Sequence, residues 1–259
     1  MVRDTLRKHY VGMNKEFRFR GEEPSRIEAL SDAGFAIAIG LLLISSTSPQ
    51  NFTELLAFTK DVIPFSMCIT TIMLVWYQHF MFFLRYGLRN SAVVVLNTML
   101  LFIILFYVYP LKFLMKMLTG IYGALLGRVF GMETNIVKTL SGMISGNDMP
   151  KLMTIYGLGA AGIFLVLMFM YRYAYKKADE LALNKIEIFD TRASIYTNLL
   201  MASIPLLSVF LILVIPNLAL ASSISGFSYF LYFPVMTIFG KQVTKKRNQL
   251  LALENGEKS

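Results

Sequence analysis

Asp32 is a charged residue in a part of the chain where a charge is costly. It lies six residues after Arg26, in an apolar run that continues to Ser46. Such a run is typical of a membrane helix, and an ionised carboxylate about two turns inside one costs at least about 2.5–3.5 kcal/mol. We therefore expect Asp32 to face a partner side chain or water.

Three other polar side chains lie at a similar depth in other apolar runs. His79, Asn97 and Asn198 are each six to eight residues from an arginine at one end of their run, as Asp32 is. A helix rises about 1.5 Å per residue, so all four lie roughly 9–12 Å inside their helices. Polar side chains at one depth predict a layer that is hydrogen-bonded across helices.

Spacing along a helix limits which of these groups can pair. Arg26 is also expected to belong to this polar network. It is about 240° from Asp32 around one helix, so each of the two needs partners elsewhere. Trp76 and His79 are three residues apart and share a face. Trp has one N–H donor, and neutral His has one donor and one acceptor. A network of these two with Ser31 and Asp32 would satisfy all four.

This polar layer has three interpretations. It could only join helices, it could hold the first helix in a functional position, or it could relay protons through Asp32 and His79. The first two are compatible, and the residues alone do not choose among the three.

The elements that carry these residues are expected to be membrane helices. The chain is 56% hydrophobic with a mean hydropathy of +0.57, well above a soluble domain. The apolar runs are continuous rather than alternating, which predicts an all-α membrane protein. Six runs are long enough to cross about 30 Å of hydrocarbon. They are 27–48, 62–84, 91–114, 152–174, 194–215 and 218–240.

Lys and Arg are distributed unevenly between the two sides of these spans. If the N-terminus is cytosolic, 19 of the 25 basic residues lie in cytosolic segments. The positive-inside rule then places both termini in the cytosol, as a basic segment 1–26 and a basic tail 241–259 around a membrane domain, 27–240. Within that domain, 115–151 is expected on the outer side, as an extension of the third helix followed by one or two short interfacial helices.

The net charge of +9 fits this distribution without a nucleic-acid partner. Membrane lipids are the expected partners, because anionic headgroups attract basic residues next to the membrane. The residues assigned to that surface are Arg18, Arg20, Lys245, Lys246 and Arg247.

The residue types that catalysis or metal binding would need are sparse. Cys68 is the single cysteine, and the two histidines, His9 and His79, lie in different segments. No Cys/His metal spacing, phosphate-binding glycine loop or nucleophile motif occurs. We therefore expect no enzyme activity, no resident metal and no cofactor.

Three runs resemble the potassium channels of the transmembrane protein 175 family. Arg26-x-x-x-Leu30-Ser-Asp32 is similar to that family's Arg-x-x-x-Phe-Ser-Asp at the start of its first helix. Trp76-Tyr-Gln-His79-Phe-Met-Phe-Phe resembles its Trp-x-x-His-x-x-x-Phe in the second helix. Asn97, in the apolar run that follows Leu96, resembles its third-helix pattern.

The resemblance implies an architecture for the whole assembly. Six transmembrane helices form each repeat, and single-repeat members assemble as homotetramers with the first helix of each subunit lining a central pore. The implied pore-lining residues are Ile37, Leu41 and Ile44, whose spacing puts them on one stripe of a helix. Gly40 stands where the family usually has a threonine.

The expected function is a potassium-permeable cation channel in a prokaryotic inner membrane. Rings of branched aliphatic side chains could close its pore by dewetting. Potassium would be the permeant ion rather than a cofactor. The alternative is a secondary transporter or proton-coupled carrier, although 27–114 and 152–240 show no convincing inverted repeat.

Overall fold

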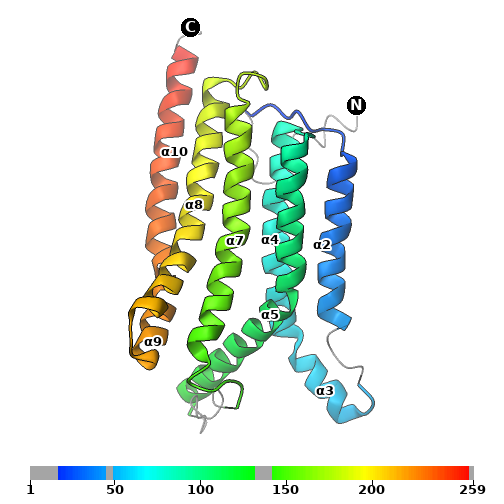
Figure 1. Cartoon of the computed structure of the whole chain (residues 1–259), viewed down its shortest axis with the longest axis vertical. Coiled ribbons are helices and arrows are strands. Elements are labelled where there is room, and N and C mark those ends of the chain that lie inside the picture. Colours follow the sequence, from blue (N-terminus) through cyan, green and yellow to red (C-terminus); the bar gives the residue numbers. More distant parts are fainter. Residues whose placement is uncertain (1–16, 45–48, 132–141, 257–259) are drawn as a thin grey trace.

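The long helices run side by side in a bundle (Figure 1). The structure is a computed structural model that describes residues 17–44, 49–131 and 142–256. All regular structure in these ranges is helical. The main helices are α2 (Arg26–Ile44), α4 (Val62–Tyr86), α5 (Ser91–Val129), α7 (Met149–Lys176), α8 (Lys185–Val214) and α10 (Tyr232–Gly256). The short elements are α3 (Phe52–Lys60), α9 (Leu218–Ser228) and the 3-10 turn η1 (Tyr229–Leu231).

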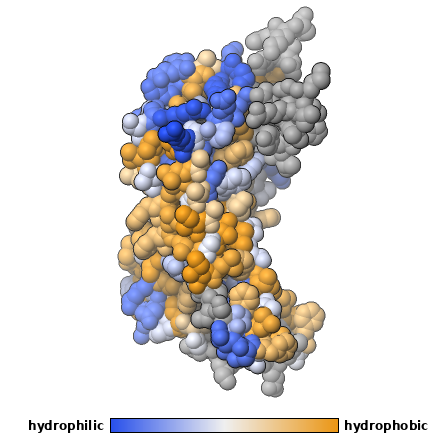
Figure 2. Space-filling model, turned by 90° about the vertical axis from the view of Figure 1, so that its right-hand side faces the viewer, coloured by the Kyte–Doolittle hydropathy of each residue, from blue (hydrophilic) through white to orange (hydrophobic). Residues whose placement is uncertain are grey.

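Six helical segments are long and apolar enough to cross a membrane, as the sequence predicted. Figure 2 shows an apolar band on one face of the molecule, between two hydrophilic ends. The segment 17–25 and the end of α10 lie at the same end of the bundle (Figure 1). An even number of spans requires that arrangement.

The ends of several helices differ from the predicted runs. α8 begins at Lys185 rather than at 194, because Asn184 and Glu187 form a capping box that starts the helix before its apolar part. The last span is interrupted by η1 and continues as a helix to Gly256. α3 was not predicted, because Phe52–Lys60 is too short and too polar to resemble a span.

α5 is much longer than a membrane is thick. Its 39 residues correspond to about 58 Å, and it bends in its lower half (Figure 1). Pro110 lies inside this helix, and proline removes one helical hydrogen bond. The expected extension of the third helix beyond 114 is thus present. In the stretch where short helices were expected after it, residues 132–141 lie outside the described residues, and 142–148 form turns rather than a helix.

Candidate pore helix and the groups that hold it

α2 lies at the edge of the bundle, next to α4 and α5 (Figure 1). Ser31, Ala38 and Leu42 on its inner face are completely buried. Ile37 and Ile44 on its outer face are 57% and 77% exposed in the subunit. One face of α2 is therefore packed, and the opposite face presents apolar side chains that the rest of the described subunit does not cover.

The remaining positions of the predicted stripe fall between these two faces. Leu41 is half-buried and packs against the hydrophobic core. Gly40 is half-buried too, but a Cβ at this position would meet no atom within 4 Å. At the inner face, by contrast, a Cβ on Gly34 would lie 3.0 Å from Leu101, so α2 and α5 approach closely there.

A chain of hydrogen bonds joins the buried face of α2 to α5 and α4. The Asn97 Nδ2 donates to Ser31 Oγ at 2.7 Å, and Ser31 Oγ donates to the Ile27 carbonyl at 2.8 Å. The Asn97 Oδ1 lies 2.8 Å from His79 Nε2. Since that amide oxygen can only accept, His79 carries its proton on Nε2. Each of these hydrogen bonds has one donor and one acceptor, so the donors point from His79 through Asn97 and Ser31 to the Ile27 carbonyl.

His79 lies in an aromatic enclosure on α4. Its ring centroid is 4.8 Å from that of Phe83 and 5.5 Å from that of Phe35 on α2. Its second nitrogen, Nδ1, is buried without a hydrogen-bond partner in the described chain. The imidazole is therefore held by one polar contact and by ring packing.

Asp32 makes a separate contact with α4. Trp76 Nε1 donates to Asp32 Oδ1 at 2.8 Å, and the Trp76 ring stacks on Phe80 with centroids 5.5 Å apart. Asp32 itself is exposed in the subunit. The aspartate thus has the polar partner that its position required, but it is not bonded to the Ser31–Asn97–His79 chain.

Two residues that the sequence grouped with this layer lie elsewhere. Asn198 on α8 bonds to the Ser194 carbonyl at 2.9 Å and does not join the others. Its inclusion in the layer was wrong, because equal depth says nothing about how each helix is rotated. Arg26 is exposed at the start of α2, and its side chain contacts no polar group among the described residues.

The start of α2 is capped locally. Ser25 N donates to Glu28 Oε2 at 2.6 Å, and Glu28 N donates to Ser25 Oγ at 3.3 Å. This reciprocal pair satisfies two backbone donors that a helix start leaves free. Glu28 therefore needs no cation from another helix.

Sequence reasoning missed the way residues 17–25 are fixed; we call this segment the N-terminal strap. Arg18 and Arg20 both pair with Glu187, with N···O distances of 3.1 and 2.8 Å, and Glu187 is fully buried. The backbone N–H groups of Arg20 and Gly21 donate to the Leu84 carbonyl. The strap thus ties the first turn of α8 to the end of α4 and leads directly into α2 (Figure 1).

Two glycines allow the strap to approach α4 this closely. A Cβ on Gly21 would lie 2.1 Å from the Phe83 carbonyl oxygen. Gly87 ends α4 with φ +59°, a conformation that favours glycine, and lies against Arg20. Phe17 is buried beside Tyr86, with ring centroids 5.7 Å apart.

Several basic residues assigned to lipid therefore have protein partners. Besides Arg18 and Arg20, Arg247 on α10 pairs with the nearly buried Asp190 at 3.0 Å. These ion pairs could not be read from the sequence, because the carboxylates that bind the arginines are far away along the chain. Contact with lipid stays a prediction for these three residues, as it does for Lys245 and Lys246.

The other end of α2 is held by α5. Lys112 Nζ donates to the Leu42 carbonyl at 2.9 Å. A cation near the last carbonyls of a helix is favourable, because they carry the negative end of the helix dipole. One turn further on, Lys116 pairs with Asp61 between α3 and α4 at 2.7 Å. α2 is thus fixed at its start, in its middle and near its end.

These features define a multi-pass, all-helical membrane protein with one helix fixed on one face and open on the other. Among the described residues, no group of three or more His, Cys, Asp or Glu side chains could hold a metal.

Comparisons with known proteins identify the family. The model of the endosomal/lysosomal potassium channel TMEM175 family matches residues 26–107. A potassium channel of Marivirga tractuosa is 50% identical over 242 residues, covering 93% of this chain and 96% of the relative. The chain belongs to the TMEM175 family.

Solved structures agree with this assignment. A crystal structure of a variant of the potassium channel MtTMEM175, in complex with a nanobody–MBP fusion protein, has a TM-score of 0.79 at 50% identity, over 91% of this chain and 100% of that chain. A TMEM175 homologue of Chamaesiphon minutus is 18% identical with a TM-score of 0.48, over 84% of this chain and 96% of that chain. The second likeness is too weak to add to the fold.

Proposed function

We propose that this protein is the subunit of a potassium-permeable channel in a prokaryotic inner membrane. The observation that carries the proposal is the 50% identity, over 93% of the chain, with a protein named as a potassium channel. The exposed apolar face of α2 fits the proposal, because a pore formed between subunits needs a helix face that the rest of its own subunit leaves open.

The pore is expected to form between copies of the chain. A single α2 at the edge of its bundle cannot surround an ion path, so closed symmetry has to supply the other walls. We propose a homotetramer in which the four α2 helices face a common axis. Native mass spectrometry of the protein purified in detergent tests the assembly, and a stable monomer that still conducts ions would contradict it.

The constriction is assigned to Ile37, Leu41 and Ile44. Ile37 and Ile44 are largely exposed, and Leu41 presents only part of its side chain because it also packs on the core. Rings of these side chains would form an apolar throat that resists wetting. Gly40 lies beside it and supplies no side-chain oxygen to a dehydrated ion.

The polar contacts are assigned a positioning role in this channel. Ser31, Asn97 and His79 hold the buried face of α2, and Trp76 with Asp32 holds its edge. Both termini are proposed to be cytosolic, which the Lys/Arg distribution supports.

The experiment that tests the function is potassium flux from liposomes containing the purified protein. A potassium gradient should drive a flux that scales with the applied potential and is absent from empty liposomes. Intact assemblies that pass no potassium would contradict the proposal.

A further inference from the structure

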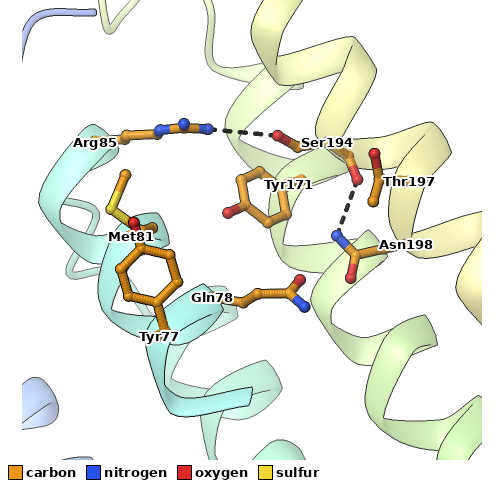
Figure 3. Close-up of a pocket in the computed structure, with 8 residues that line it drawn as sticks. All are labelled: Tyr77, Gln78, Met81, Arg85, Tyr171, Ser194, Thr197 and Asn198. Carbon is orange, nitrogen blue, oxygen red and sulfur yellow. Dashed lines mark hydrogen bonds between the residues drawn. The ribbon is translucent and has the colours of Figure 1, made fainter. Parts of the chain in front are cut away.

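A cavity of about 190 Å³ with a mixed polar and apolar lining lies between α4, α7 and α8, at the end of the bundle that carries the strap (Figure 3). One water molecule needs about 10–15 Å³ of such space, so the cavity can hold a group much larger than a single water. One of its lining residues, Tyr77, is 37% exposed. Its polar lining is formed by Gln78, Arg85, Tyr171, Ser194, Thr197 and Asn198.

Two buried polar atoms of this lining have no hydrogen-bond partner. They are Arg85 Nε and Asn198 Oδ1, and the only other such side-chain atom in the described chain is His79 Nδ1. Asn198 is 2% exposed, and its Nδ2 is used by the Ser194 carbonyl. The cavity therefore presents one unused cationic donor and one unused acceptor, and native proteins rarely leave such groups unpaired.

Arg85 also lacks a counterion among the described residues. Its nearest polar contact is a long one, 3.5 Å from Nη1 to Ser194 Oγ, and its other face lies 5.0 Å from the Phe17 ring. The two buried carboxylates nearby, Glu187 and Asp190, are bound by other arginines. The cavity lining contains no acidic residue. A half-buried guanidinium in such a place is matched best by an anion with oxygen acceptors.

We propose that this cavity binds a glycerol phosphate group, in which a phosphate is esterified to a glycerol that keeps free hydroxyls. Phosphate oxygens would accept from Arg85, and a ligand hydroxyl would donate to Asn198 Oδ1. Arg85 is the penultimate residue of α4, and a long basic side chain near the end of a membrane helix reaches toward the headgroup region. The same chemistry could come from a phosphatidylglycerol headgroup or from a dissolved glycerol phosphate.

Such a ligand would connect two parts of the subunit that barely touch. The backbones of α4 and α8 do not approach closely, and a hydrogen bond of 2.8 Å between the hydroxyls of Tyr86 and Thr191 bridges them. α4 also carries Trp76 and His79, which hold α2. A ligand on Arg85 and Asn198 would thus stabilise the position of α4 against the outer helices.

The test measures ligand binding to the full-length protein after delipidation in detergent, and it does not depend on conduction. Thermal melting and native mass spectrometry are followed while phosphatidylglycerol, phosphatidylcholine or glycerol 3-phosphate is added. Phosphatidylglycerol should raise Tm and be retained, whereas phosphatidylcholine, which lacks free hydroxyls and a net charge, should do neither. Arg85→Gln should raise the dissociation constant of phosphatidylglycerol about tenfold or more, since a charged hydrogen bond is lost.

Two further variants separate this site from general attraction of lipid to positive charge. Arg172→Gln removes an exposed arginine of α7 at the same end of the bundle and should leave binding within about twofold of the original protein. Thr197→Phe fills the cavity, retains Arg85 and should abolish binding even if Arg85→Gln fails to fold. Binding of glycerol 3-phosphate alone would assign a soluble ligand of the same class. Equal binding of both lipids, or binding that survives Thr197→Phe, would overturn the proposal and leave a cavity filled with water.

Discussion

The two faces of α2 differ from those of a helix in a soluble protein, because a polar side chain lies among the buried residues and large apolar side chains are exposed. The buried face carries a polar side chain, Ser31, that is hydrogen-bonded to Asn97. The exposed face carries Ile37 and Ile44, which no other part of the described subunit covers. Burying an unpaired polar group is costly, whereas apolar exposure costs nothing in contact with lipid or another apolar surface.

This difference separates two tasks along a single helix. Directional hydrogen bonds on the buried face fix the rotation of α2, because a bonded donor and acceptor tolerate little movement. Side chains on the exposed face can then be selected for what they present to the proposed pore, without affecting how the subunit folds. The comparison predicts large stability effects from one face and small ones from the other.

Asn97→Leu should have the largest effect on the fold. It leaves His79 Nε2 buried without a partner and removes the hydrogen bond that Ser31 Oγ accepts, at a cost of about 2 kcal/mol or more. The melting temperature in detergent should fall by about 4 °C or more. Thr98→Leu, an exposed neighbour on α5, is the matched control and should melt within about a degree of the original protein. Equal melting of both variants would mean that hydrogen bonds do not hold the buried face.

Glu187→Gln should have the next largest effect, because it frees the N-terminal strap. Arg18 and Arg20 lose a shared carboxylate, which weakens folding by about 1–2 kcal/mol since both guanidinium groups can still reach water. Limited trypsin digestion should cut within 17–25 faster than in the original protein. The exposed Glu180, paired with Lys177, provides the control variant Glu180→Gln. Unchanged cleavage in Glu187→Gln would remove the ion pairs from the account of how α2 begins.

Trp76→Phe should have the smallest effect of the three. It retains an aromatic ring beside Phe80 but removes the N–H donor to Asp32, a loss of about 0.5–1.5 kcal/mol. Asp32 is exposed and can bind water instead, so the protein should still fold and assemble. The melting temperature, recorded beside that of Asn97→Leu, measures the difference. A larger loss than in Asn97→Leu would mean that the exposed pair, and not the buried chain, fixes α2.

Most of the fold could be predicted from the sequence because apolar content is continuous in each span. The errors occur where helices leave the hydrocarbon. The first turns of α8 are charged and look like a loop until Asn184 is recognised as a cap. α3 contains too few residues to give a signal.

Several members of the polar contacts around α2 were predictable, but their pairings were not. Depth along each run identified Asp32, His79 and Asn97, but the rotation of each helix decided that Asn97 bonds to Ser31 while Asn198 does not join them. The strap left no sequence signal beyond its basic residues, because its partner Glu187 is more than 160 positions away. Contacts between residues so far apart in sequence form only when the helices pack into the bundle.

The central claim is that the outer face of α2 lines the ion path, and a matched pair of isoleucines tests it most directly. Ile37 on α2 and Ile238 on α10 are both 57% exposed in the subunit. Ile37→Asn would place amide groups in an apolar throat, so it should wet more readily and raise potassium flux severalfold in liposomes. Ile238→Asn changes the same side chain on a helix remote from α2 and should leave flux unchanged. Raised flux for Ile37→Asn alone is the predicted result; equal flux from both variants, in intact assemblies, would contradict the assignment of α2 as the pore helix.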